Sequence, residues 1–245
     1  MRFRGFTGTA SVLIAVAAAA SLPHDARAAG AAYQVDTAEV SEPGHCKVES
    51  WLSLADNHDL VAAATPTCAF DIGRPAEFST QFTRTRTDGL WDTAAAPKAK
   101  INLAPSGIGI FGVAVTATGF YDLTAGRNTG LEMVVPATVR LSDTMRINLN
   151  AGWLWDRVAD RHYAVYGAGV DIRTPDNVWT VTAEVFGQIG SADVAGVTQP
   201  RFQAGLRWRP VDDFNVDVIY GRNIQGENAN WVTVATTVRF SVEKK

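Results

Sequence analysis

His162 is the residue of this sequence with the clearest potential for catalysis, because it is the only histidine after residue 58. A serine hydrolase needs such a base within hydrogen-bond reach of a serine, together with a polar group that orients the imidazole. The hairpin expected around His162 contains no serine, so we expect a polar surface residue and no enzymatic activity. Hydrolysis of lipid esters is the catalytic alternative. The sequence contains no metal-ligand cluster, nucleotide-binding loop or nucleophile elbow, and we expect no cofactor.

The two cysteines, Cys46 and Cys68, are placed to form a disulfide bond. Between them lies WLSLADNHDLVAAAT, two extended runs around the turn-forming tetrapeptide DNHD. In a hairpin centred on Asn57 the cysteines face each other, and loop-entropy arguments give such a disulfide about 3 kcal/mol of stabilisation. A metal site with His45 or His58 is the alternative, although these residues do not have a recognisable ligand spacing.

The overall composition excludes one class of partner. The 245 residues carry a net charge of -3, so the chain has no basic field that would attract nucleic acid. The mean hydropathy is -0.01, a value common to soluble proteins and to membrane barrels whose interior is polar.

The first 28 residues are typical of a cleaved secretory signal peptide. Arg2 and Arg4 precede the apolar run ASVLIAVAAAA, and the triplet ARA ending at residue 28 fits the small-x-small cleavage pattern. A membrane anchor needs about 20 apolar residues, but Pro23 and Asp25 interrupt this run too early. Residues 29–43 show no periodicity and predict a flexible leader, so residues 44–245 form the folded domain.

Beyond the leader, runs of about ten residues alternate between apolar and polar side chains and are separated by Gly, Pro, Asn and Asp. This length suits a tilted strand that crosses a bilayer, whereas strands of soluble sandwiches average five or six residues. Twelve strands are therefore predicted, at 45–55, 60–70, 75–86, 90–103, 107–121, 130–141, 144–156, 161–173, 177–189, 200–209, 213–223 and 230–240.

The connections and the aromatic residues favour a barrel in a membrane over a soluble β-sandwich. Short connections such as LSD and TPDN alternate with longer polar ones, DLTAGRNTG, GSADVAGVTQ and NIQGENAN, and outer-membrane barrels have short periplasmic turns and longer outer loops. Aromatic side chains on the apolar faces lie at strand ends, as in the two interfacial girdles of such barrels. They are Phe120, Trp153, Trp155, Trp179, Phe202, Trp208, Phe214 and Tyr220.

Several motifs resemble a family of exported, mostly uncharacterised proteobacterial outer-membrane β-barrel proteins. These motifs are GWLWDRV, AEVFGQIG, PRFQAGLRW and VIYGRNIQGENANW, at residues 152–158, 183–190, 200–208 and 218–231. The resemblance implies an outer-membrane, porin-like or transporter-like barrel of a Gram-negative bacterium and carries no catalytic signature. The expected fold is all-β: a single antiparallel up-and-down transmembrane β-barrel of about twelve strands.

The last predicted strand also resembles the signal by which barrels are recognised by the barrel-assembly machinery. The alternating residues Val232, Val234 and Val238 lead to the aromatic Phe240, while Thr236 and the tail SVEKK depart from the pattern. The final strand is expected to pair with the first and to close the barrel.

The interior of the barrel is predicted to carry charges of both signs. They could pair and fill the lumen, or they could line a passage for a small polar solute. In GIGIFGVAVTATG the expected inward residues Gly107, Gly109, Val113, Val115, Ala117 and Gly119 would leave space, which favours a narrow passive channel. The expected lumen-lining residues are Lys98, Lys100, Glu132, Arg140, Arg146, Asp156, Asp171, Glu184, Arg207, Asp217 and Arg239.

Two arginines provide a possible contact with lipid. Arg84 and Arg86 share the strand parity of Phe78 and Phe82, so they are expected to face outwards at the outer rim. There they could bind lipopolysaccharide phosphates, or they could simply be solvated. A plugged structural barrel that interacts with lipopolysaccharide is therefore the main alternative to a channel.

Overall fold

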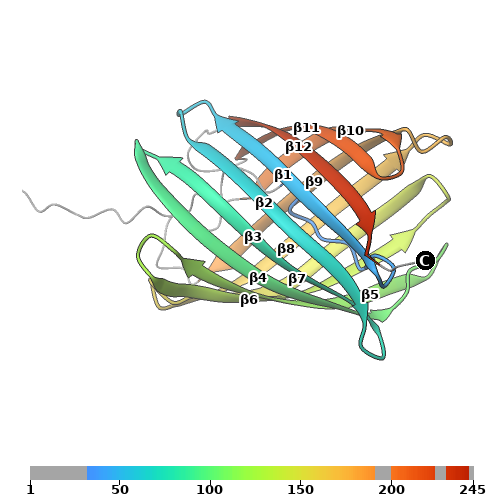
Figure 1. Cartoon of the computed structure of the whole chain (residues 1–245), viewed down its shortest axis with the longest axis horizontal. Helices are drawn as coiled ribbons and strands as arrows, with labels where there is room; N and C mark the ends of the chain where they lie inside the picture. Colours follow the sequence, from blue (N-terminus) through green and yellow to red (C-terminus); the bar gives the residue numbers. More distant parts are fainter. Residues whose placement is uncertain (1–31, 191–199, 224–229, 243–245) are drawn as a thin grey trace, which may run out of the picture.

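The side chains of every strand alternate between two surroundings, and the sheet that these strands form closes into a barrel (Figure 1). The computed structural model describes residues 32–190, 200–223 and 230–242. Its strands are β1 (His45–Ala55), β2 (Leu60–Asp71), β3 (Pro75–Thr87), β4 (Leu90–Ala104), β5 (Phe111–Asp122), β6 (Arg127–Arg140), β7 (Met145–Asp156), β8 (Arg161–Arg173), β9 (Trp179–Gly190), β10 (Arg201–Val211), β11 (Phe214–Asn223) and β12 (Asn230–Ser241).

Neighbouring strands are antiparallel and follow one another in chain order, and β12 returns to pair with β1. Val48 pairs with Val238 in this closing ladder, so each of the twelve described strands has a partner on both sides. At the rim, Asp56 accepts hydrogen bonds from the side-chain amide and the backbone N–H of Asn230 at 2.7 and 3.1 Å. These bonds lower the pKa of the Asp56 carboxyl and tie the first hairpin to the last strand.

The prediction of a single antiparallel up-and-down barrel of about twelve strands is confirmed. Most strand ends agree with the sequence pattern within two residues, but β5 begins at Phe111 and β6 at Arg127. Residues before β5 form a separate small bridge between Gly107 and Ile110, with Gly109 at a φ of 69°. This left-handed conformation favours glycine and interrupts the strand.

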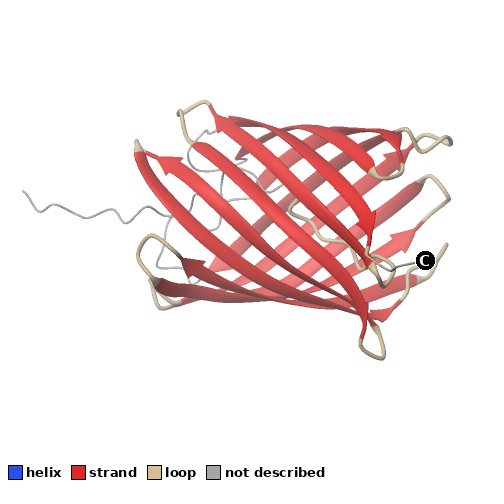
Figure 2. Cartoon of the chain, in the orientation of Figure 1, coloured by secondary structure: helices blue, strands red, loops and turns tan. Residues whose placement is uncertain are grey.

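The connections lie at the two ends of the barrel (Figure 2). We call the end with the β2–β3 and β10–β11 turns the short-turn end, and the opposite end the long-loop end. The expected difference in loop length does not hold everywhere. At the short-turn end residues 105–110 connect β4 and β5, whereas at the long-loop end Asp122 pairs with Arg127 and leaves only residues 123–126 between β5 and β6. Much of DLTAGRNTG is thus strand rather than loop.

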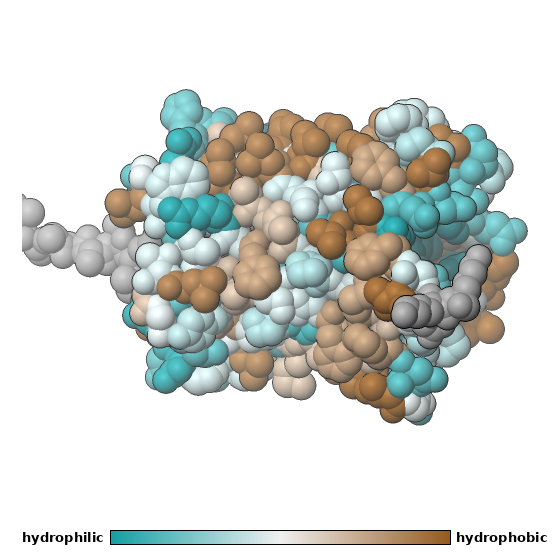
Figure 3. All heavy atoms as spheres, in the orientation of Figure 1, coloured by the Kyte–Doolittle hydropathy of each residue, from teal (hydrophilic) through white to brown (hydrophobic). Residues whose placement is uncertain are grey.

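The outer surface of the strands is apolar. Exposed aliphatic side chains include Leu149, Val181, Leu206, Val218 and Val234. On the face in Figure 3, apolar residues lie over the strands and hydrophilic residues gather mainly towards the two ends. In a water-soluble protein this continuous apolar surface would be unfavourable, whereas lipid would solvate it.

Aromatic rings mark both ends of the apolar surface. At the short-turn end the rings of Trp179 and Trp208 stack with centroids 6.3 Å apart, and at the long-loop end Trp153 is 37% exposed. Phe120 is a correction to the predicted set, because it lines the interior cavity instead of the outer surface. In β5 the even-numbered residues face inwards, and Phe120 is one of them.

The predicted disulfide between Cys46 and Cys68 is present. The two residues lie directly opposite each other in the β1–β2 register, with their Cα atoms 4.1 Å apart. On the next strands, Cys46 pairs with Phe240 and Cys68 pairs with Phe78. The disulfide therefore lies between two outward-facing rings at the short-turn end.

Replacement of both cysteines by serine is expected to lower the free energy of unfolding by about 3 kcal/mol, because the bond closes a loop of 22 residues in the unfolded chain. Urea unfolding of the refolded barrel, with and without reductant, measures this difference. The serine variant should be insensitive to reductant, and free thiols in the exported wild-type protein would contradict the prediction.

The predicted signal peptide, residues 1–28, lies outside the described residues. Where the chain is described, none of it forms a helix with the length and apolarity that a bilayer crossing requires.

Candidate functional site

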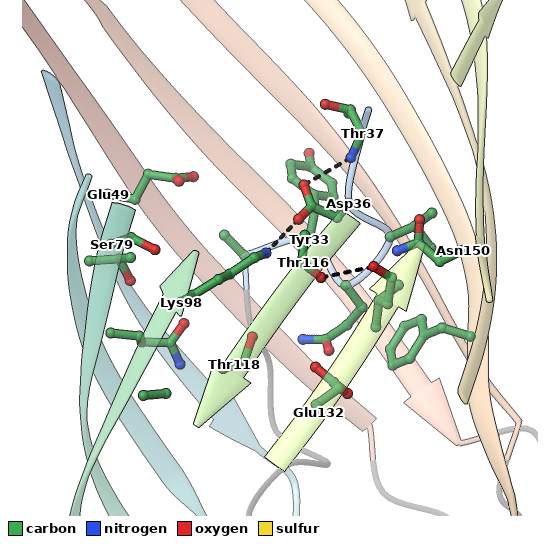
Figure 4. Close-up of a pocket in the computed structure, with 18 of the residues that line it drawn as sticks. Tyr33, Asp36, Thr37, Glu49, Ser79, Lys98, Thr116, Thr118, Glu132 and Asn150 are labelled. Carbon is green, nitrogen blue, oxygen red and sulfur yellow. Dashed lines mark hydrogen bonds and ion pairs between the residues drawn. The ribbon is translucent and has the colours of Figure 1, made fainter. Parts of the chain in front are cut away.

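Residues 32–43, here called the N-terminal segment, lie inside the barrel and contact its inner wall (Figures 1 and 4). Tyr33 is near the middle of the barrel, where its hydroxyl donates to Asp217 at 3.3 Å. The backbone N–H of Ala38 donates to the hydroxyl of Thr138, and further along Ser41 donates to Glu77. The segment therefore runs through the lumen towards the short-turn end, where β1 begins.

Glycines on the inner wall provide the space for this segment. A Cβ atom at Gly167 would lie 2.9 Å from the side chain of Val35, and one at Gly205 would lie 2.5 Å from the Tyr33 hydroxyl. Next to this space, the buried carboxylate of Glu184 accepts hydrogen bonds from the backbone N–H groups of Gln34 and Val35. The wall is thus shaped for the segment and satisfies part of its backbone.

Asp36 connects the segment to β4. Its carboxylate forms ion pairs with Lys98 and Lys100, the latter at 2.9 Å (Figure 4). On the other side, the amide of Asn150, oriented to satisfy its neighbours, pairs with the backbone N–H and C=O of Asp36 at 2.7 and 2.8 Å. Asp36 is therefore held from two parts of the wall, β4 and β7, which are three strands apart.

Glu39 forms a second ionic anchor nearer the short-turn end. It pairs with Arg140 at 2.6 Å and with Arg146 at 2.5 Å, and it also accepts a hydrogen bond from Ser106. Arg146 bridges further to Asp171 at 2.6 Å. Through these ion pairs the segment is attached to β6 and β7 and, by way of Arg146, to β8.

A further ion pair, apart from those of Asp36 and Glu39, joins the adjacent strands β10 and β11. The Nε of Arg207 donates to Asp217 at 2.8 Å, and the guanidinium lies 5.5 Å from the ring centroid of Tyr33. Asp217 also accepts a hydrogen bond from Asn215. This pair is in direct contact with the N-terminal segment through Tyr33.

The structure brings most of the expected lumen residues to one space. A cavity of about 650 Å³ extends from Asp92, beside the β3–β4 turn, to Arg239, near the β10–β11 turn. Eight acidic and seven basic residues line it, so its charge is nearly balanced. The expected residues among them are Lys98, Lys100, Glu132, Arg146, Asp171, Glu184, Arg207 and Arg239.

Three expected lumen residues are placed differently. Arg140 pairs with Glu39 at the end of the N-terminal segment, and Asp217 is 1% exposed beneath Arg207 and Tyr33. Asp156 is one of the even-numbered residues of β7, which face inwards. Its carboxylate, however, accepts hydrogen bonds from the backbone N–H groups of Val158 and Ala159 in the following turn.

The expected inward face of strand five is wrong. The residues that line the cavity are Thr116, Thr118 and Phe120, whereas Ala117 is exposed on the outer surface. The interior there carries hydroxyl groups rather than the glycines and valines of the predicted face. Both faces of this strand consist of small or apolar residues, so the sequence pattern did not distinguish them.

The N-terminal segment is the functional feature that the sequence analysis missed. Residues 29–43 were expected to form a flexible leader, yet Asp36 and Glu39 contact strands far away in the sequence. One available signal was the presence of glycine at inward positions of β8 and β10, Gly167, Gly169 and Gly205. Glycine in a strand indicates a place where another group approaches closely.

The outer-surface candidates remain separate from the lumen. His162 lies beside two indole rings, with centroids 5.4 Å from Trp153 and 6.4 Å from Trp155. The guanidinium of Arg84 lies 5.0 Å and that of Arg86 5.8 Å from the ring centroid of Trp91. Within the described ranges, no group of three or more histidine, cysteine, aspartate or glutamate residues could hold a metal ion.

Comparisons with known proteins agree with this architecture. A model of the family described as "Uncharacterised conserved protein UCP029691" matches residues 17–240. No curated protein sequence matches the chain significantly. Among solved structures, the KdgM porin aligns with a TM-score of 0.61 and 9% identity over 79% of this chain and 99% of its own.

Two further solved structures give the same result. The NanC porin aligns with a TM-score of 0.63 and 8% identity over 78% of this chain and 98% of its own. KdgM in complex with disordered oligogalacturonate aligns with a TM-score of 0.61 and 10% identity over 79% and 99% of the two chains. At these identities the likeness establishes a fold, that of outer-membrane porin barrels.

Proposed function

Because the chain belongs to the uncharacterised conserved protein family UCP029691 and has the fold of outer-membrane porins, we propose that it is a narrow passive channel for small polar solutes. The observation that carries this proposal is the cavity of about 650 Å³, which remains beside the N-terminal segment and extends towards both ends of the barrel. The complex of KdgM with oligogalacturonate supports a polar solute class.

The N-terminal segment acts in this proposal as a constriction. It occupies part of the lumen, so a solute passes between the segment and the opposite wall. Polar groups along this passage would replace part of the hydration shell of a solute, as pore linings do in other channels.

The proposed location is the outer membrane, reached by means of the cleaved signal peptide of residues 1–28. The barrel-assembly machinery would recognise the last strand, in which Val232, Val234, Val238 and Phe240 face outwards and are about half exposed. Phe240 then belongs to the periplasmic girdle, because short turns mark the periplasmic end of such barrels.

A plugged structural barrel is the second candidate. It is favoured by the ion pairs of Asp36 and Glu39, which attach the segment to β4, β6 and β7 of the wall. In this form the barrel could bind lipopolysaccharide through Arg84 and Arg86, whose guanidinium groups lie on the outer surface over Trp91. Paired arginines are well suited to phosphate groups.

Planar-bilayer recordings of the refolded chain without residues 1–28 distinguish the two candidates. We expect discrete current steps above the protein-free blank, because the cavity, which charged residues line, extends towards both ends of the lumen. A folded barrel, identified by its heat-modifiable mobility on a gel, that produces no current would favour the plugged candidate.

A further inference from the structure

The two halves of the barrel interior differ in how completely they are filled. Around β7 to β12, large inward side chains are buried, namely Leu154, Tyr163, Phe186, Ile219 and Trp231. The N-terminal segment also lies against this half, since Val35 packs near Gly167 of β8 and Tyr33 near Gly205 of β10. The cavity still borders these strands, at residues such as Asp171, Glu184 and Arg207, but here it shares the lumen with the large side chains and the segment.

The half formed by β2 to β5 carries small and hydroxyl-bearing side chains between its inward charged residues Glu77, Asp92, Lys98 and Lys100. On β4 the inward residues Ala94 and Ala96 pair with Thr83 and Gln81 of β3. In the next register position, Ser79, Lys98 and Thr118 lie side by side across three strands (Figure 4). We call the seven hydroxyl residues of this half the hydroxyl wall: Thr65, Thr67, Ser79, Thr83, Thr85, Thr116 and Thr118.

The hydroxyl wall is available to a solute. All seven residues border the cavity, and the hydroxyls of Thr65, Thr67, Ser79 and Thr118 make no hydrogen bond to another residue within the described ranges, whereas the Thr116 hydroxyl donates to the Val134 carbonyl. The two cations of the adjacent strand, Lys98 and Lys100, are both paired with Asp36. The wall therefore offers neutral groups, each of which can donate and accept a hydrogen bond.

From this arrangement we infer that the channel preferentially passes uncharged polyhydroxylated solutes of mono- or disaccharide size, along the hydroxyl wall. This inference rests on the proposed channel function and specifies its solute class. Neutral hydroxyls can exchange hydrogen bonds with the hydroxyls of such a solute, but they compensate poorly for the lost hydration of a net charge. Cavities of roughly 300 to 1,000 Å³ hold molecules of this size.

Efflux from proteoliposomes tests the inference with three solutes of similar size: glucose, the anion gluconate and the cation glucosamine. With the wild-type protein, glucose should leave faster than either charged solute by about threefold or more, a factor within the range of one net hydrogen bond. The triple variant Thr67→Val, Thr83→Val and Thr118→Val keeps the side-chain volume and should slow glucose efflux by about threefold to tenfold.

The matched control is Thr80→Val, which makes the same change on β3 at an outward-facing position and should leave glucose efflux unchanged. Ion conductance, recorded in parallel, separates the existence of a channel from its solute class. Absence of both conductance and efflux would refute the channel itself. Conductance with equal or faster efflux of a charged solute, or a triple variant that behaves like the wild type, would overturn only the inferred solute class.

Discussion

Deletion of residues 29–43 is expected to raise the single-channel conductance several-fold and to shift the channel towards anion selectivity. The deletion removes the segment that occupies part of the lumen, so the cross-section available to ions becomes larger. It also removes Asp36 and Glu39, and leaves their partners Lys98, Lys100, Arg140 and Arg146 without these carboxylates. Current steps and the reversal potential in a salt gradient measure the two effects separately.

The double variant Asp36→Asn and Glu39→Gln separates charge from steric obstruction. It keeps the segment at full length but removes both ionic anchors, so it should show the anion shift even if the segment stays in the lumen. Glu42→Gln is the matched control, because Glu42 belongs to the same segment and is exposed. A deletion variant with wild-type conductance and selectivity, in a barrel that folds normally, would show that the segment does not restrict the passage.

The fold could be predicted from the sequence because the side chains of a barrel strand alternate between residues that suit lipid and residues that suit a polar lumen. In β7, Met145, Ile147 and Leu149 alternate with Arg146 and Asn148, one set suited to lipid and the other to a polar lumen. A soluble sandwich would produce a similar alternation, so the length of the strands and the aromatic residues at their ends were also needed.

The sequence pattern does not define the two faces of a strand whose side chains are alike on both sides. In β5 the odd-numbered and even-numbered residues from Phe111 to Phe120 are all small, apolar or threonine, and a shift of one residue exchanges the two faces. The register became clear only from the neighbours, because Thr118 lies between Lys98 and Glu132, which face the lumen.

The N-terminal segment could not be predicted from its own residues. AYQVDTAEVSEP has no periodicity, and acidic residues in such a composition are typical of a solvated leader. Asp36 and Glu39 acquire a structural role only when barrel closure brings basic residues 62 to 107 positions away into contact with them. Such contacts depend on the tertiary fold.

Asp217→Ala is expected to produce the largest loss of stability, about 3–5 kcal/mol, because removal of one partner leaves the other charge of a buried pair uncompensated. Asp217 is 1% exposed and accepts hydrogen bonds from Arg207, Asn215 and Tyr33. Urea unfolding followed by tryptophan fluorescence measures the free energy of unfolding. Asp213→Ala, in the exposed β10–β11 turn, is the control and should have little effect.

The double variant Arg207→Ala and Asp217→Ala shows whether water of the lumen reaches this ion pair. If the pair lies in a dry interior, loss of both charges should restore part of the stability lost in Asp217→Ala, because no unpaired charge remains. If water of the passage reaches the pair, Asp217→Ala alone should lose less than about 1 kcal/mol, as for exposed ion pairs. The first result would assign Arg207 and Asp217 to the structural half of the barrel, together with the N-terminal segment. The second would add Asp217 to the lining of the passage, beside Arg207, which already borders the cavity.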